Sequence, residues 1–240
     1  MNTTRIIHFK EATKCASSRN TMVRAGGRLA NVLVGPTANI KIPDARVSAI
    51  VQCYNSASTM KDTLESLKGN VDRILCIDGF FRMDKTPHAH PAKSKTGTST
   101  DNSRFLAKQY GAEWISGDRE YQTQMDKLNR IPELVPDGEW AFIIDTDEVL
   151  VSLIQNGLRA CAGWLGQWAD MVPMRIDEPY YTHPFTGNLG RNRYYARLFR
   201  VKKGMRWPEE GTVIYPEGRV TLYMGTFPMT VYLKHLRRDP

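Results

Sequence analysis

The 240-residue sequence has few cysteines and no long apolar run. None of Cys15, Cys53, Cys76 and Cys161 lies in Cys-x-x-Cys spacing, so neither a zinc site nor a redox motif is indicated. No apolar stretch approaches the roughly 20 residues that cross a bilayer, and the first 14 residues lack the apolar core of a secretory signal. We therefore expect no transmembrane segment and a cytoplasmic protein with reduced thiols; peripheral attachment to a membrane stays open.

Positive charge is concentrated near the N-terminus. Residues 1–46 hold eight basic and two acidic residues, and so carry six of the eight excess positive charges. This segment is also rich in chain breakers, which predicts a basic N-terminal extension rather than part of the core. Two interpretations of it remain open: an arm that binds a polyanion, either nucleic acid or an anionic membrane surface, and a solvated arm that aids solubility.

Strand-like and helix-like segments alternate between residues 47 and 147. Hydrophobic residues make up 41% of the sequence and charged residues 24%, which is ordinary for a globular domain with a hydrophobic core. The alternation predicts a three-layer α/β sheet with parallel strands. The expected strands are 47–53, 71–78, 112–116 and 139–145, and the expected helices are 58–68, 101–110 and 118–135, the last kinked or ended near Pro132.

The second half of the sequence is less regular. We expect an amphipathic helix over about 150–168 and a strand over 170–176, followed by a basic aromatic stretch at 191–207. That stretch has two interpretations, a surface that lines a binding site and a strand pair with aromatic core residues and solvated cations.

Three carboxylates follow the apolar run at 140–144, namely Asp145, Asp147 and Glu148. Like charges at this spacing raise one another's pKa unless a cation lies among them, and a divalent metal, an Arg or Lys, and water are the candidates. Asp-x-Asp at the end of a buried strand suits Mg²⁺ or Mn²⁺, which prefer oxygen ligands. A solvated acidic turn is the alternative.

Polar residues also end two other predicted strands. Asn55 follows the first strand and Asp78 ends the second. Because ligands of such sheets bind beyond the carboxyl ends of the strands, these residues and the Asp-x-Asp pair are expected to face one crevice. For Asp78, a turn-forming Asp before Gly is the alternative.

Four segments in order resemble the nucleotide-sugar domain of family-2 glycosyltransferases: VSAIVQCYNSASTMKDTLESLKG, VDRILCIDG, NSRFLAKQYGAEWI and GEWAFIIDTDEVL. The later YYARLFRVKKGMRW is similar to the Arg-Leu-Phe-Arg segment of the family's bacterial surface-sugar branch. The resemblance implies a GT-A-type three-layer α/β/α sandwich with a mixed, mostly parallel central sheet. It also implies a nucleotide-sugar-binding half at 47–150 and an acceptor-binding half at 151–240.

The resemblance implies roles for residues on the donor side. Tyr54 and Asn55 would line the nucleotide pocket, and Asp78 would accept a hydrogen bond from the base, usually uracil. Gln124 and Lys127 would face the donor, although a solvated helix face is the alternative for Lys127. The sequence departs from the family's Asp-Asp-Gly-Ser pattern, because Asp-Gly-Phe-Phe begins at position 78.

The resemblance also implies a metal site. Asp145 would touch the sugar or ribose and Asp147 would bind Mn²⁺ or Mg²⁺, so that the pair carries the ion that bridges the phosphates. His235 would be a further ligand, or else a strand histidine with a satisfied hydrogen bond. Arg237 and Arg238 would meet the diphosphate, since guanidinium fits phosphate in a bidentate fork.

An inverting transferase also needs a carboxylate that takes the proton of the acceptor hydroxyl. Glu209 and Glu210 follow the Arg-Leu-Phe-Arg segment and are the first candidates, with Asp177 and Glu178 as the second pair. The family's Val-His-Glu is absent. For each of these acids, the alternative interpretation is an ordinary surface charge with no catalytic role.

The sequence therefore predicts a metal-dependent glycosyltransferase that moves a sugar from a nucleotide-diphosphate sugar, expected to be a UDP-sugar, to a carbohydrate or other hydroxyl acceptor. One alternative is a nucleotidyltransferase, but the segment QCYNSAST lacks the glycines of a phosphate loop. The other is a nucleic-acid-binding protein that uses the basic arm.

Overall fold

The computed structural model describes most of the chain outside the N-terminal extension and several loops. The described residues are 3–7, 45–80, 97–116, 121, 123–152, 156–167, 169–182, 189–208, 213–216, 219–223 and 231–236.

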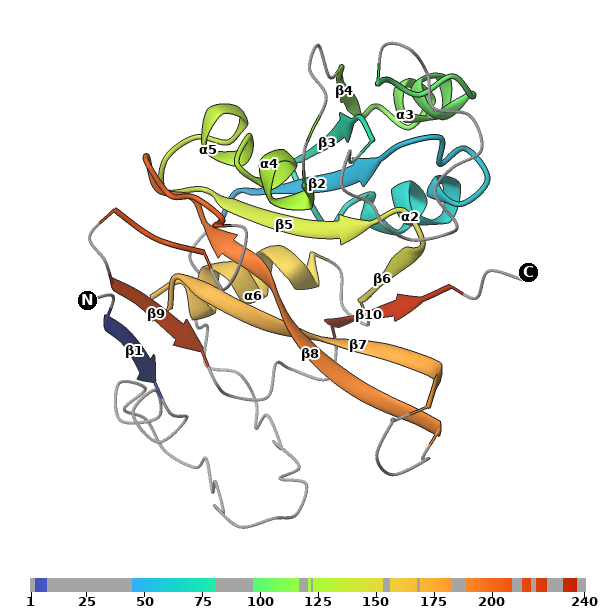
Figure 1. The fold of residues 1–240 in the computed structure, drawn as a ribbon. Coiled ribbons are helices and arrows are strands. Elements are labelled where there is room, and N and C mark those ends of the chain that lie inside the picture. Colours follow the sequence, from blue (N-terminus) through green and yellow to red (C-terminus); the bar gives the residue numbers. More distant parts are fainter. Residues whose placement is uncertain are drawn as a thin grey trace.

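Four parallel strands form the part of the sheet that the sequence predicts. Their order is β5-β2-β3-β4, and every adjacent pair is parallel. Figure 1 shows β2, β3 and β5 pointing in the same direction, with the connecting helices above and below them. The strands are β2 (Val47–Cys53), β3 (Arg73–Asp78), β4 (Glu113–Ile115) and β5 (Trp140–Asp145).

The predicted helices of this half are also present, and one of them is divided. They are α2 (Met60–Leu67), α3 (Ser103–Gln109), α4 (Gln124–Leu128) and α5 (Ile131–Leu134). A capping box starts α4, because Thr123 and Asp126 each accept a backbone hydrogen bond from the other. Pro132 stands in the first turn of α5, where its missing N–H costs nothing, so it begins the second piece.

The second half of the chain extends the sheet beyond β5. β7 (Met171–Thr182) and β8 (Leu189–Arg200) form a long antiparallel hairpin, and β8 also pairs antiparallel with β5. β9 (Arg219–Tyr223) pairs parallel with β7 and with β1 (Thr3–Ile7). The predicted mixed, mostly parallel sheet is confirmed.

One predicted element is wrong in part. The expected helix at about 150–168 begins later than predicted, because α6 spans Gly157–Leu165. The start of the predicted range belongs instead to strand β6 (Glu148–Ser152). β6 pairs antiparallel with β10 (Val231–His235), so a distant segment decides its conformation. β-branched Val149 and Val151 suit the strand.

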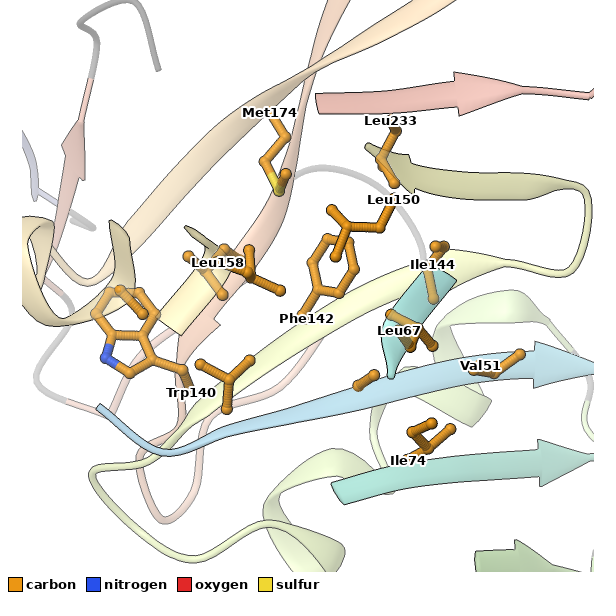
Figure 2. Packing of buried hydrophobic residues seen from close by; sticks show 14 of the residues in the cluster. Val51, Leu67, Ile74, Trp140, Phe142, Ile144, Leu150, Leu158, Met174 and Leu233 are labelled. Atoms are coloured by element: carbon orange, nitrogen blue, oxygen red, sulfur yellow. The ribbon is translucent and has the colours of Figure 1, made fainter. Parts of the chain in front are cut away.

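Side chains alternate between the two faces of β2 and build two cores. Val47, Ala49 and Val51 join a cluster with α2 and α6, whereas Ile50 packs with α4 and α5 on the other face. Figure 2 shows Phe142 of β5 in the first cluster, among residues of β6, α6 and β7. Helices therefore cover both faces of the sheet, which confirms the predicted three layers.

The remaining predictions about the chain as a whole have mixed outcomes. Cys53, Cys76 and Cys161 are buried free thiols. In the described residues, no helix has the length and apolar character needed to cross a membrane. β1 lies within the predicted basic extension, but residues 8–44 fall outside the described part of the chain, and the domain boundaries stay a prediction.

Candidate active site at the carboxyl ends of β2, β3 and β5

The strand register brings the predicted donor-side residues to one edge of the sheet. Asp78 pairs with Cys53 and Asp145 pairs with Gln52, so the two carboxylates flank the end of β2. Asn55 follows that end directly. In Figure 1 the arrowheads of β2, β3 and β5 lie next to one another at this edge.

Asp78 is only 1% exposed and is held by Ser99. The Ser99 hydroxyl donates to Asp78 Oδ1 at 2.6 Å, and the Ser99 backbone N–H donates to Oδ2 at 3.0 Å. Burial raises the pKa of Asp78, whereas the hydrogen bonds from Ser99 and the charge of Lys127 oppose that rise. Asp78 thus anchors the segment that contains Ser99 to the end of β3.

Asn55 anchors the same segment from β2. Its backbone has φ of 46°, a left-handed conformation that Asn tolerates better than most residues. Its N–H donates to Ser99 Oγ at 2.8 Å, and its Oδ1 accepts from the N–H of Thr100 at 2.8 Å. Tyr54, the preceding residue, is buried, and its ring lies 5.5 Å from that of Phe80.

Lys127 reaches the same edge from α4. It is 1% exposed, and its ammonium donates to the carbonyl oxygen of Cys53 at 2.9 Å. Burial lowers the pKa of Lys127 to about 8, against the opposing influence of Cys53, Asp78 and Asp145. The solvated-face alternative for Lys127 is therefore wrong. Gln124, at the start of α4, is exposed.

The acidic turn is neutralised in part by an arginine from another strand. Arg197 of β8 donates from Nη2 to Asp145 Oδ2 at 3.0 Å and to Glu148 Oε1 at 2.7 Å. Glu148 Oε2 accepts from the N–H of Asp145 at 3.0 Å. Glu148 is 2% exposed, and burial raises its pKa to about 7, which Arg197 opposes.

Two neighbouring elements hold the backbone of this turn. The buried hydroxyl of Thr63, on α2, contacts the carbonyl oxygens of Thr146 at 2.9 Å and Glu148 at 2.7 Å. On the other side, the N–H of Leu236 donates to the carbonyl oxygen of Asp147 at 2.7 Å. The turn is thus fixed by α2 and by the chain that follows β10.

The acceptor-side candidates are less fully described. The backbone of His235 lies opposite Glu148 in the β6–β10 pair, which brings β10 beside the acidic turn. Asp177 alternates with buried Ile176 on β7 and so lies on the sheet face opposite to the core cluster. Glu178 is also on β7, and Glu209, Glu210, Arg237 and Arg238 lie outside the described residues.

Two residues of this cluster had no assigned role in the sequence-based prediction. The sequence places Glu148 in the charge concentration after the buried strand and Arg197 in the Arg-Leu-Phe-Arg segment, and it indicates no role for either. The one available signal is electrostatic, since carboxylates this close after a buried strand are stabilised by a nearby cation, for which an Arg or Lys is one candidate.

The oxygen donors of the turn suit a hard divalent ion. No group of three or more His, Cys, Asp or Glu side chains able to hold a metal occurs among the described residues. Mg²⁺ is usually bound through one or two carboxylates together with phosphate oxygens of a substrate, and Asp145 and Asp147 supply two carboxylates that are two positions apart in the chain.

No protein-family model and no curated protein match the sequence. Solved structures that resemble the chain include glucosyl-3-phosphoglycerate synthase from Mycobacterium tuberculosis in complex with Mn²⁺, uridine diphosphate and glucosyl-3-phosphoglycerate, at 17% identity and a TM-score of 0.37, over 55% of this chain and 44% of that chain. Residues 1–349 of S. aureus TarS resemble it at 13% identity and a TM-score of 0.44, over 80% of this chain and 60% of that one. The chain thus spans less than two thirds of either structure.

Proposed function

We propose that this chain is a metal-dependent glycosyltransferase that moves a sugar from a UDP-sugar to a hydroxyl acceptor. One observation carries the proposal: the ends of β2, β3 and β5 gather Asp78, Lys127 and the acidic turn at a single edge. A nucleotide-diphosphate sugar presents a base, a diphosphate and a sugar, and this edge offers buried polar groups beside a carboxylate-rich turn.

The donor would lie across the strand ends. Tyr54, Asn55 and the anchored residues 97–101 would form the wall of the nucleotide pocket, with Asp78 at its base. Lys127 brings a positive charge to the end of β2, 2.9 Å from the carbonyl oxygen of Cys53, and would attract the diphosphate. Gln124 is exposed at the start of α4 and would face the donor, and Arg237 and Arg238 would approach the diphosphate from the C-terminal end of the chain.

The acidic turn would hold the metal. Asp145 and Asp147, with His235 as a further ligand, would bind Mn²⁺ or Mg²⁺. When bound, the ion neutralises charge that builds up on the departing diphosphate. Arg197 keeps Asp145 and Glu148 in fixed positions, so that the turn needs no rearrangement when the donor arrives.

Transfer also requires a base on the acceptor side. Glu209 or Glu210 would remove the proton of the acceptor hydroxyl, with Asp177 and Glu178 as the second pair. The basic aromatic residues that begin β8 would line the acceptor, which is a carbohydrate or another hydroxyl compound.

A donor screen tests the proposal. Purified chain is incubated with a panel of nucleotide sugars, with Mn²⁺ and with chelator, and released nucleoside diphosphate is measured. We expect release from a UDP-sugar that requires the metal and falls by at least about 100-fold in Asp147→Ala. Asp137→Ala is the matched control, because this exposed carboxylate precedes β5 at the far end of the strand.

The other outcomes separate the alternatives. Release that ignores both the metal and Asp147→Ala would contradict the proposal. Release of pyrophosphate from a nucleoside triphosphate would indicate a nucleotidyltransferase. Salt-sensitive binding of DNA or RNA that survives Asp147→Ala, without donor turnover, would indicate a nucleic-acid-binding protein.

A further inference from the structure

The carboxylate of Asp78 is covered by Ser99. Only 1% of Asp78 is exposed, and each of its two oxygens already accepts a hydrogen bond from Ser99, one from the hydroxyl and one from the N–H. A ligand could therefore reach this carboxylate only by displacing Ser99. That displacement would leave a buried charged group without its donors, which is costly.

The segment that contains Ser99, residues 97–101, is bound to the strand ends at several points. The carbonyl oxygen of Gly97 accepts from the N–H of Phe80, just after β3, at 3.2 Å. Asp101 Oδ2 accepts from the N–H of Ala57, just after β2, at 2.9 Å. These contacts anchor the segment on both sides of Ser99, so moving Ser99 would break several hydrogen bonds together. The cover over Asp78 is thus part of the fold.

Asn55 offers a polar group that this arrangement leaves accessible. Its Oδ1 accepts from the N–H of Thr100 at 2.8 Å, so the Nδ2 end of the amide is turned away from that bond. Asn55 is half-buried, beside the wall that the segment forms. Nδ2 can only donate hydrogen bonds, and uracil and cytosine both carry the acceptor O2. A contact of this kind recognises a pyrimidine without distinguishing the two.

Uracil and cytosine differ at one edge of the ring. Uracil presents the N3–H donor and the O4 acceptor, whereas cytosine presents N3 as an acceptor and an amino group as the donor. A carboxylate at that edge accepts from N3–H of uracil and repels the N3 lone pair of cytosine. The resemblance to family-2 glycosyltransferases gives this role to Asp78, but Ser99 occupies the oxygens that would perform it.

We infer that Asp78 is a positioning residue that holds residues 97–101 against the strand ends and does not contact the base, so that this chain binds uridine and cytidine diphosphates about equally. The inference rests on the proposed function, because it assumes a nucleotide donor at this edge. It widens the substrate class, since CDP-sugars become donors alongside UDP-sugars.

The test compares UDP with CDP, because the two differ only at the edge in question. Binding of each nucleotide in the presence of Mg²⁺ is measured by titration calorimetry on the full chain. The two dissociation constants should agree within about fivefold, whereas a carboxylate that accepts from N3–H would favour UDP by at least about tenfold. The comparison uses the wild-type chain, so it stands even if a variant does not fold.

Two variants test the positioning role. Asp78→Asn and Ser99→Ala should each weaken UDP and CDP binding by the same factor, about threefold or more, because either change loosens the segment. The double variant should lose little more than the weaker-binding single variant, since both act through the same hydrogen bonds. Asp62→Asn is the matched control, because it makes the same change at an exposed carboxylate of α2, and it should alter neither affinity.

A wild-type preference for UDP above about fivefold would overturn the inference, and its loss in Asp78→Asn would show that Asp78 contacts the base. Turnover of a UDP-sugar would then still support the proposed function. Additive losses in the double variant would also overturn the positioning role. A chain that binds both nucleotides equally but consumes neither UDP-sugar nor CDP-sugar would support the inference and contradict the proposed function, and a chain that binds neither nucleotide would contradict both.

Discussion

The ammonium of Lys127 lies 2.9 Å from the carbonyl oxygen of Cys53, a residue 74 positions earlier in the chain. This contact ties α4 to the end of β2 at the edge where the donor is proposed to bind. The lysine is buried, and burial lowers its pKa to about 8. The charge is therefore present at neutral pH but is kept there at a cost in folding free energy.

Replacement of Lys127 by Met should change how stability depends on pH. The folded-state pKa of about 8 lies below the ordinary lysine pKa of 10.5, so the unfolded chain binds more protons between these pH values. Stability of the wild type should thus rise with pH across that window, by up to about 3 kcal/mol. Lys127→Met should lose this rise and should bind donor more weakly. Urea unfolding at intervals from pH 7 to 10 measures the difference, and parallel profiles for the two proteins would contradict it.

Gly79 should not tolerate a side chain. Its φ is +138°, and an added Cβ would lie 2.7 Å and 2.8 Å from ring carbons of Tyr121. We expect Gly79→Ala to lower the free energy of unfolding by about 1 to 3 kcal/mol more than Gly69→Ala does. Gly69 is a suitable control because it also has a positive φ, of +73°, but has open space around its Cβ position. Thermal or urea unfolding of both variants gives the comparison, and similar losses would argue against a clash with Tyr121.

Much of the first half of the fold follows from local sequence patterns. The apolar, β-branched run of β2 predicts a strand with the observed bounds, because such runs are rarely anything else when turn residues flank them. The same reasoning finds β5 and α2. β6 escapes it, because Val149-Leu150-Val151 merges with the apolar positions of α6 and its strand conformation depends on β10, more than 70 residues later.

About as much of the candidate site as of the fold can be predicted from local sequence patterns. Asn55, Asp78 and Asp145 follow from the rule that parallel strands end at one edge, and the structure brings their positions together. Arg197 could not be assigned in this way. Its direction is set by a bulge in the register of β7 against β8, and no local pattern in the sequence specifies that register.

The hydroxyl of Thr63 should stabilise the backbone of the acidic turn. It contacts the carbonyl oxygens of Thr146 and Glu148 and is fully buried. Thr63→Val keeps the shape but removes the one hydroxyl hydrogen that these two carbonyls share, so the free energy of unfolding should fall by about 1 to 3 kcal/mol. Thr63→Ser retains the hydroxyl and should therefore retain most of its stabilisation of the turn. The two variants are compared by urea unfolding and by Mn²⁺ affinity, and a Thr63→Val protein that matches Thr63→Ser in both would contradict the role.

Ser99→Ala should destabilise the protein more at neutral than at acidic pH. The Ser99 hydroxyl donates to Asp78 at 2.6 Å and accepts from Asn55 at 2.8 Å, so its loss raises the pKa of the buried Asp78 further. The folded-state pKa of Asp78 already lies above its ordinary value, so between these two pKa values the native state binds more protons than the unfolded state. The free energy of unfolding therefore falls as pH rises through that window.

The serine matters most once the carboxylate is ionised, because the donated hydrogen bond stabilises the charged form more than the neutral form. We therefore expect a loss of about 1 to 3 kcal/mol at pH 7 and a smaller loss near pH 4, together with a raised KM for the donor. Ser58→Ala, at an exposed serine between β2 and α2, should change none of these. Unfolding by urea at both pH values decides the matter, because a loss that is equal at pH 4 and pH 7 would mean that Ser99 supports the backbone alone and not the charge on Asp78.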